Sequence, residues 1–169
     1  MKEIYDKNTI EFVQVALEYC AMMESVSKTS LPTFVDKAVK IMPLLYLKGV
    51  LLPTVEEPED DREPEKFITE TTYNAIRYGL EELFGNDDTY LETFHPDIRY
   101  SDTPIAVSIS ESLTDIYQDI GNFIALFRTG NENVMTQALY ICREDFRLYW
   151  GQKLLNALKA IHNVYINNY

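Results

Sequence analysis

Residues 110–127 read SESLTDIYQDIGNFIALF, and this stretch decides the fold class. Its large apolar side chains recur every three or four residues, which is the period of an α-helix with one buried face. They are Leu113, Ile116, Ile120, Phe123 and Phe127. Ser110 stands where a helix N-cap is expected, and Gly130 stands where the chain can leave the helix. The stretch therefore predicts an amphipathic helix that packs against other elements.

The same helical period continues outward in both directions. The predicted helices begin near Asn8, Ser30, Thr69, Ser110 and Asn131. Pro43 lies well inside the second helix, so we expect a kink or a break there. The last helix keeps its phase past Gly151, which predicts one long C-terminal helix with a bend near that glycine. These patterns predict an all-α, single-domain bundle of about five main helices over residues 1–169.

Two connectors interrupt the helical pattern. Residues 53–66 hold seven acidic and two basic residues with three prolines, which predicts a solvated acidic, Pro-rich connector. Its oxygen spacing does not match a calcium-binding loop. A short helical turn is expected over 88–94, followed by an irregular connector over 95–109. Residues 105–109 alternate as a strand would, but they are too isolated to predict a sheet.

Composition and charge exclude several classes of protein. The net charge of −12 and the absence of a cationic cluster argue against a nucleic-acid partner. The longest apolar run, residues 41–53, is interrupted by Pro43, Lys48 and Gly49, so no membrane span is predicted. The N-terminal residues do not resemble a signal peptide. Cys20 and Cys142 fall inside helical patterns and are expected to be buried thiols, as in a cytoplasmic protein.

An acidic row gives the helix over 110–127 its chemical interest. Glu111, Asp115 and Asp119 are spaced four apart and therefore share one face. The row is interpreted as a solvated or partner-facing surface, with a divalent-metal face as the alternative. All-α nucleotide pyrophosphohydrolases bind magnesium with such pairs, but they need a second Glu-x-x-Glu pair on an earlier helix. Here that spacing occurs at Glu56 and Glu59, inside the acidic connector.

Other catalytic and metal-binding patterns are incomplete. A ferritin-like di-metal centre needs two Glu-x-x-His pairs, and the chain offers one, Glu92 with His95. The chain has too few His and Cys ligands to predict a zinc site. There is no Gly-rich phosphate loop and no Gly-x-Ser-x-Gly motif. No catalytic residue, metal ligand or cofactor is therefore assigned, which favours a non-enzymatic role.

The C-terminal helix places a lysine on an apolar face. Phe146, Tyr149, Trp150 and Lys153 share that face, and a half-buried ammonium needs a carboxylate partner. We therefore expect Lys153 to pair with Asp115 or Asp119 across the bundle. His162 lies at the edge of the apolar stripe and is interpreted as a structural histidine.

Three blocks of sequence carry a family resemblance. They are KIMPLLYLK (40–48), TDIYQDI (114–120), and YWGQKL (149–154) continuing to AIH (160–162). In this order and spacing the chain resembles the bacterial domain-of-unknown-function family numbered 5063 over nearly its whole length. The resemblance implies a small, standalone helical protein and supplies no activity. It also draws attention to the polar and aromatic residues of these blocks, which are Asp115, Tyr117, Asp119, Trp150, Lys153 and His162.

Two hypotheses about function follow. The first is a helical protein-interaction or adaptor module that presents an acidic surface and grooves to a partner or to itself. The second is a metal-dependent hydrolase or small-ligand-binding protein that uses Glu111, Asp115 and Asp119, with Lys153 and His162. A module should leave the acidic row exposed and unorganised, whereas an enzyme must gather it with other polar groups in a pocket. Self-association through the second helix, with Leu44, Leu47, Leu51 and Leu52, is a further alternative.

Overall fold

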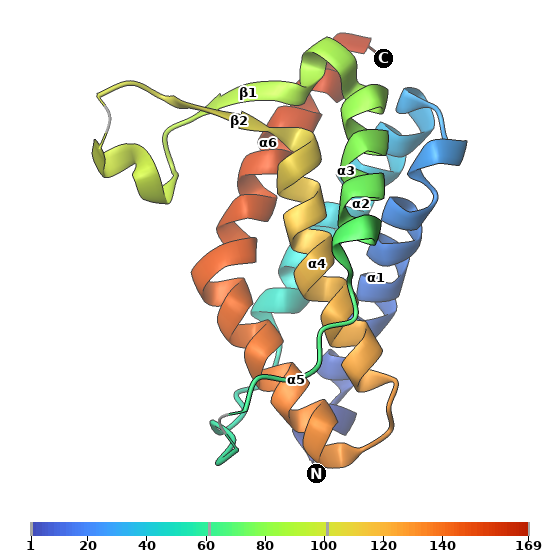
Figure 1. Ribbon diagram of the computed structural model, residues 1–169, viewed down its shortest axis with the longest axis vertical. Helices are drawn as coiled ribbons and strands as arrows, with labels where there is room; N and C mark the ends of the chain where they lie inside the picture. Colours follow the sequence, from blue (N-terminus) through green and yellow to red (C-terminus); the bar gives the residue numbers. More distant parts are fainter. Residues whose placement is uncertain (1, 61, 101, 169) are drawn as a thin grey trace.

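The fold is known from a computed structural model that describes residues 2–60, 62–100 and 102–168. Asp61 and Ser101, which the sequence places in the two connectors, lie outside the described residues, as do Met1 and Tyr169. The helices are α1 (Lys7–Glu24), α2 (Leu31–Val50), α3 (Glu70–Phe84), α4 (Ile109–Phe127), α5 (Glu132–Asp145) and α6 (Gly151–Asn168). A π-helical segment, Phe146–Trp150, joins α5 to α6 without interruption. The expected all-α bundle is confirmed, because these elements run alongside one another (Figure 1).

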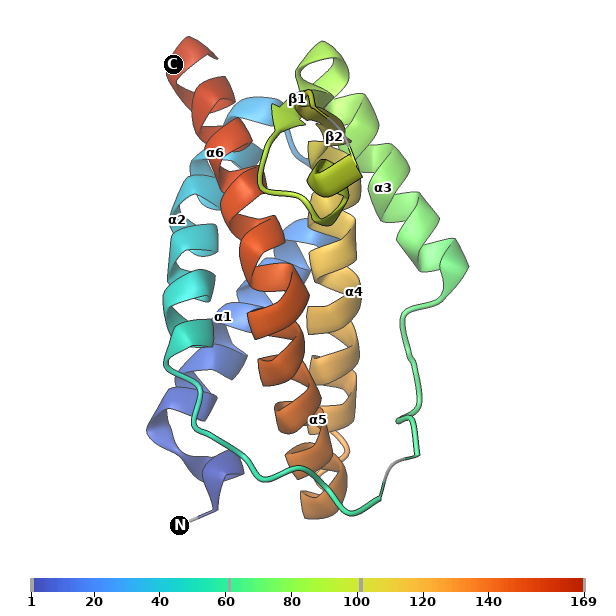
Figure 2. The same cartoon turned by 90° about the vertical axis from the view of Figure 1, so that its left-hand side faces the viewer.

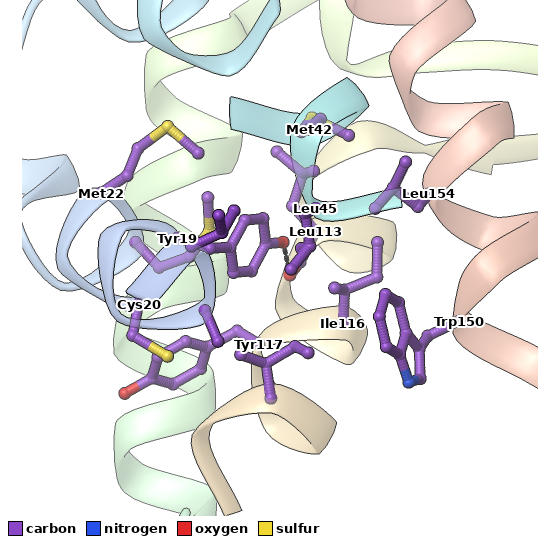
Figure 3. Packing of buried hydrophobic residues seen from close by; sticks show 14 of the residues in the cluster. Tyr19, Cys20, Met22, Met42, Leu45, Leu113, Ile116, Tyr117, Trp150 and Leu154 are labelled. Carbon is purple, nitrogen blue, oxygen red and sulfur yellow. Dashed lines mark hydrogen bonds between the residues drawn. The ribbon is translucent and has the colours of Figure 1, made fainter. Parts of the chain in front are cut away.

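The core lies around α4, which packs against α1, α3, α5 and α6. Leu113, Ile116 and Ile120 are fully buried, as their spacing predicts. Burying one such side chain stabilises the fold by about 1.5–3 kcal/mol. The hydroxyl of Tyr19 on α1 donates to the carbonyl oxygen of Leu113 at 2.7 Å, so this buried polar group has a partner (Figure 3). Among the described residues, no helix combines the length and the apolar character needed to cross a membrane.

Helix boundaries differ from the sequence expectation at two N-termini. The cap of α1 is Asp6, whose side chain accepts from the Asn8 amide, instead of Asn8 itself. The cap of α4 is Ser108 in place of Ser110. Ser110 is buried, and its amide and hydroxyl each donate to the Asp88 carboxylate at 2.7 Å. Helix α2 continues through Pro43 without the break that the sequence allowed.

A two-stranded arm replaces the helical turn expected over 88–94 and part of the irregular connector over 95–109. Strand β1 (Thr89–Glu92) pairs antiparallel with β2 (Ile105–Ser108), with Thr89 opposite Ser108 and Glu92 opposite Ile105. A short 3-10 helix, Pro96–Tyr100, lies between the strands. The alternating residues 105–109 do contain a strand, and the expectation was wrong because their partner, residues 89–92, was assigned to a helical turn. Figure 2 shows the arm in front of α4 and α6, near the C-terminal end of the bundle.

Gly151, where a bend is expected, directly follows the π segment. A Cβ atom on Gly151 would lie 2.5 Å from the backbone oxygen of Phe146, so this close approach requires glycine. The wider turn of the π segment also places Tyr149 and Trp150 in different surroundings, although the sequence pattern assigns both to one face. Trp150 is 1% exposed and its indole nitrogen donates to the Cys142 carbonyl oxygen, whereas Tyr149 is 63% exposed.

The acidic connector crosses the bundle from α2 to α3 and is held in place (Figure 2). Its acidic side chains are exposed where described, as its composition predicts. Its later part and the two residues that follow it, residues 62–68 together, are named the strap. The Gln137 side chain donates to the carbonyl oxygen of Arg62 at 2.9 Å, and the Asn122 side chain accepts from the amides of Phe67 and Ile68 at 2.7 and 2.9 Å. The connector is therefore solvated on one side and anchored to α4 and α5 on the other.

Candidate functional site

The acidic row of α4 is divided between two hollows. Glu111 and Asp115 line a cleft beneath the arm, together with Lys153. Asp119, one turn further along α4, lines a separate cavity beneath the strap. Since residues four apart share a helix face, the separation arises from what covers that face, and not from the helix itself.

Asp115 forms the centre of the first hollow. Lys153 donates to its Oδ2 at 2.7 Å, which is the pairing across the bundle that the sequence predicts. The Tyr73 hydroxyl donates to its Oδ1. Burial, followed by the hydrogen bond to Asp115, raises the pKa of Tyr73, so the phenol stays protonated. Asp115 is thus satisfied by protein donors on both oxygens.

The hollow around this pair is named the arm cleft. It consists of two adjoining spaces of about 580 and about 470 Å³, which share His95, Asp97, Lys153 and Asn156. Phe94, Leu148 and Tyr149 line its α6 side, while Tyr90 and Ser112 lie on its α4 side, 3.3 Å apart at their hydroxyl oxygens. A polar floor beside an apolar rim can bind a group that is partly apolar.

The buried carboxylate of Glu92 fixes the arm over this cleft. Glu92 belongs to the single Glu-x-x-His pair, which was too few for a di-metal centre. The Glu92 side chain is fully buried and accepts from the amides of Thr93 and Phe94 and from Lys159 Nζ at 2.9, 3.1 and 2.8 Å. Burial raises the pKa of Glu92, but these hydrogen bonds outweigh it and the pKa is lowered. The Asn156 side chain donates to the Phe94 carbonyl oxygen at 2.8 Å. Nothing in the sequence pairs Glu92 with Lys159, which lies 67 residues later.

Large apolar side chains remain exposed on the arm and on the π segment. The exposed fractions are 64% for Leu91, 69% for Phe94, 76% for Tyr100, 67% for Leu148 and 63% for Tyr149. Three of the five line the arm cleft. This surface does not follow from the sequence, because its pattern places Tyr149 on the buried face and Phe94 in a helical turn.

Three predicted site residues do not join either hollow. Tyr117 is buried towards α1, where its hydroxyl donates to Glu24 at 3.4 Å. Trp150 belongs to the core, with its ring centroid 6.1 Å from that of Phe12. His162 is exposed on α6, and its ring centroid lies 6.4 Å from that of Tyr165. Tyr117 and Trp150 therefore have structural surroundings, and His162 lies on the surface instead of being the structural histidine that was predicted. Glu111, Asp115, Asp119 and Lys153 line the two hollows.

The second hollow, named the strap cavity, has a volume of about 300 Å³ and lies between the strap, α4 and α5. Burial raises the pKa of Asp119 to about 7, helped by the negative charges of Asp145 and Asp115 and opposed by Lys153 and Lys66. Burial also raises the pKa of Asp145, with a further contribution from Glu144. Within the described part of the chain, no three His, Cys, Asp or Glu side chains are grouped as metal ligands.

Comparison with known proteins identifies relatives without assigning an activity. The model of the family described as "Domain of unknown function (DUF5063)" matches residues 3–167. The crystal structure of protein BF1032 from Bacteroides fragilis is similar, with 43% identity and a TM-score of 0.85 over 96% of this chain and 95% of that one. None of the curated proteins compared with the chain matches it significantly.

Proposed function

Because the chain belongs to the DUF5063 family, whose description names no activity, we propose a function from the arm cleft. The protein is a helical protein-interaction module that binds its partner through the arm and the π segment. The observation that carries this proposal is the exposure of Leu91, Phe94, Tyr100, Leu148 and Tyr149, each by more than 60%. Exposed aromatic and large apolar groups that gather around a cleft are typical of protein interfaces.

The charges beneath these side chains support a binding role over a catalytic one. The acidic row of α4 does line hollows together with other polar groups, as the small-ligand hypothesis requires. Its central residue is already paired, however, because Asp115 accepts from both Tyr73 and Lys153. A catalytic base or a metal ligand would need a free lone pair directed at a substrate. Binding energy would therefore come mainly from the apolar rim, with Asn156, His95 and Asp97 supplying hydrogen bonds.

The partner proposed here is a protein. The net charge of −12 disfavours nucleic acid, and two free buried thiols suit the cytoplasm. Self-association through α2 is the second possibility, because Leu44 and Leu47 are 43% and 50% exposed on that helix and Leu51, directly after it, is 41% exposed. Leu52, which was assigned to the same surface, is buried, so it cannot contribute.

Site-specific photo-crosslinking tests this proposal. A benzophenone amino acid replaces Tyr149 in the arm cleft, and a matched control replaces Tyr78, which is 58% exposed on α3. After irradiation in extract of the source organism, position 149 should yield a discrete crosslinked protein, identified by mass spectrometry, that position 78 does not yield. Adding Phe94→Ser should abolish that product. Identical products at both positions, or none, would contradict the proposal, and a crosslink to a second copy would identify self-association.

A further inference from the structure

We propose that the strap cavity binds a small organic cation, a protonated amine or a guanidinium carried on a short apolar chain. This site is independent of the arm cleft: it lies under a different cover, and the two hollows share no lining residue. It deepens the small-ligand alternative that the acidic row of α4 raised.

The charges of the strap cavity select for a cation. Four acidic residues and one lysine, Lys66, line the space. Asp119 and Asp145 reach it from α4 and α5, and neither carboxylate has a hydrogen bond or an ion pair within the described residues. Both side chains are half-buried with their unpartnered oxygens open to solvent, so the carboxylates are accessible to a ligand that enters the cavity. An ammonium or guanidinium group would supply the missing donors and the compensating charge.

The walls of the cavity suit an organic cation better than a bare metal ion. Phe123, Leu126, Ala138 and Ile141 contribute apolar surface beside the carboxylates. A divalent metal ion would need several converging oxygen ligands, whereas an amine needs one charged end and an apolar remainder. The volume of about 300 Å³ lies at the small end of the range for ligand pockets.

The strap gives the cavity a defined roof. Asn122 accepts from the amides of Phe67 and Ile68 directly beside the cavity, and Gln137 donates to the carbonyl oxygen of Arg62 at the other end. These contacts hold Lys66 and its neighbours over the opening. The cavity is therefore preformed and does not need to be organised by the ligand.

Protonation of Asp119 should control the affinity. The groups that face it are Asp115 on its own helix, Asp145 and Cys142 on α5, Lys153 on α6 and Lys66 on the strap. Burial and the charges of Asp145 and Asp115, opposed by Lys153 and Lys66, place the pKa of Asp119 at about 7. If the ionised form binds the cation, the apparent dissociation constant should rise roughly thirty-fold between about pH 8 and about pH 5.5.

The test uses n-butylammonium as the probe and n-butanol as its uncharged control, followed by nuclear magnetic resonance chemical-shift titration of the full chain. At about pH 8, n-butylammonium should shift the amides of α4 and α5 around the strap cavity saturably, and n-butanol should not. Asp119→Asn and Asp145→Asn should each weaken binding at least roughly ten-fold, which corresponds to about 1.4 kcal/mol. Glu18→Gln, which alters an exposed carboxylate on α1, is the matched control and should leave the affinity unchanged.

The spectra also show whether each variant is folded, so a lost signal is not confused with lost binding. A blocked Gly-Lys-Gly peptide distinguishes the two sources of such a cation. Binding of the peptide would indicate the side chain of a partner protein, and its exclusion would indicate a free amine. The proposal is overturned if n-butanol binds as well as n-butylammonium, if nothing saturates, or if magnesium binds in place of the amine. None of these outcomes bears on the arm cleft.

Discussion

Replacing Asp119 by asparagine should make the stability of the protein less sensitive to pH. The pKa of Asp119 rises from its ordinary 3.8 to about 7 on folding, so the folded state holds this proton more tightly than the unfolded state. Protonation therefore favours folding, and stability falls as the pH rises from about 4 to about 7. At 1.36 kcal/mol per pKa unit, the stability contributed by protonated Asp119 falls by about 2.6 kcal/mol between about pH 5 and about pH 8.

Urea unfolding at these two pH values measures the effect directly. Trp150 is the single tryptophan of the chain and is buried, so its fluorescence reports loss of the core. Comparing Asp119→Asn with the wild type at both pH values cancels any effect of the amide that does not depend on pH. The variant should gain about 2.6 kcal/mol relative to the wild type on going from about pH 5 to about pH 8. Glu18→Gln is the control, and an unchanged pH dependence in Asp119→Asn would refute the reasoning.

Three further substitutions probe other contacts of the structure. A double-mutant cycle of Lys153→Met and Asp115→Asn should give a coupling energy of up to about 1 kcal/mol in thermal or urea unfolding, and a coupling of zero would mean that the ion pair contributes nothing. Gly151→Ala should cost about 1–3 kcal/mol of stability, because its Cβ would approach the Phe146 backbone oxygen to 2.5 Å; unchanged stability would show that the π segment can shift. Glu92→Ala should release the arm, so that limited proteolysis cuts between β1 and β2 much faster while the bundle stays intact; equal cleavage rates would show that other contacts hold the arm.

The helical part of the fold was predictable because its signals are local. The spacing of Leu113, Ile116 and Ile120 identifies α4 without reference to the rest of the chain. Pairing of Lys153 with Asp115 was also predictable, since a lysine among buried aromatic residues requires a carboxylate. The cap of α1 was misplaced because Asp6 and Asn8 are both good capping residues only two positions apart.

The candidate site was predictable only in part because it is assembled by contacts between distant segments. The sequence placed Asp115 and Asp119 on one surface, but the arm covers one and the strap covers the other. The strap is positioned by Asn122, about 55 residues from Phe67, and no local pattern predicts such a bond. The exposure of Tyr149 depends on the π segment, which adds a residue to one helical turn. The regular α-helical spacing, from which the buried face was predicted, therefore does not hold there.

The two buried cysteines provide built-in probes of how the bundle opens. Burial raises the pKa of Cys20 to about 12 and also raises the pKa of Cys142 well above its ordinary value, and alkylating reagents attack the thiolate form. Each thiol should therefore react only during moments when its own helix, α1 or α5, separates from the core. In single-cysteine variants the two labelling rates then measure two opening free energies. Equal values would identify the bundle as one cooperative unit, while faster reaction at Cys142 would locate the less stable part beside the strap.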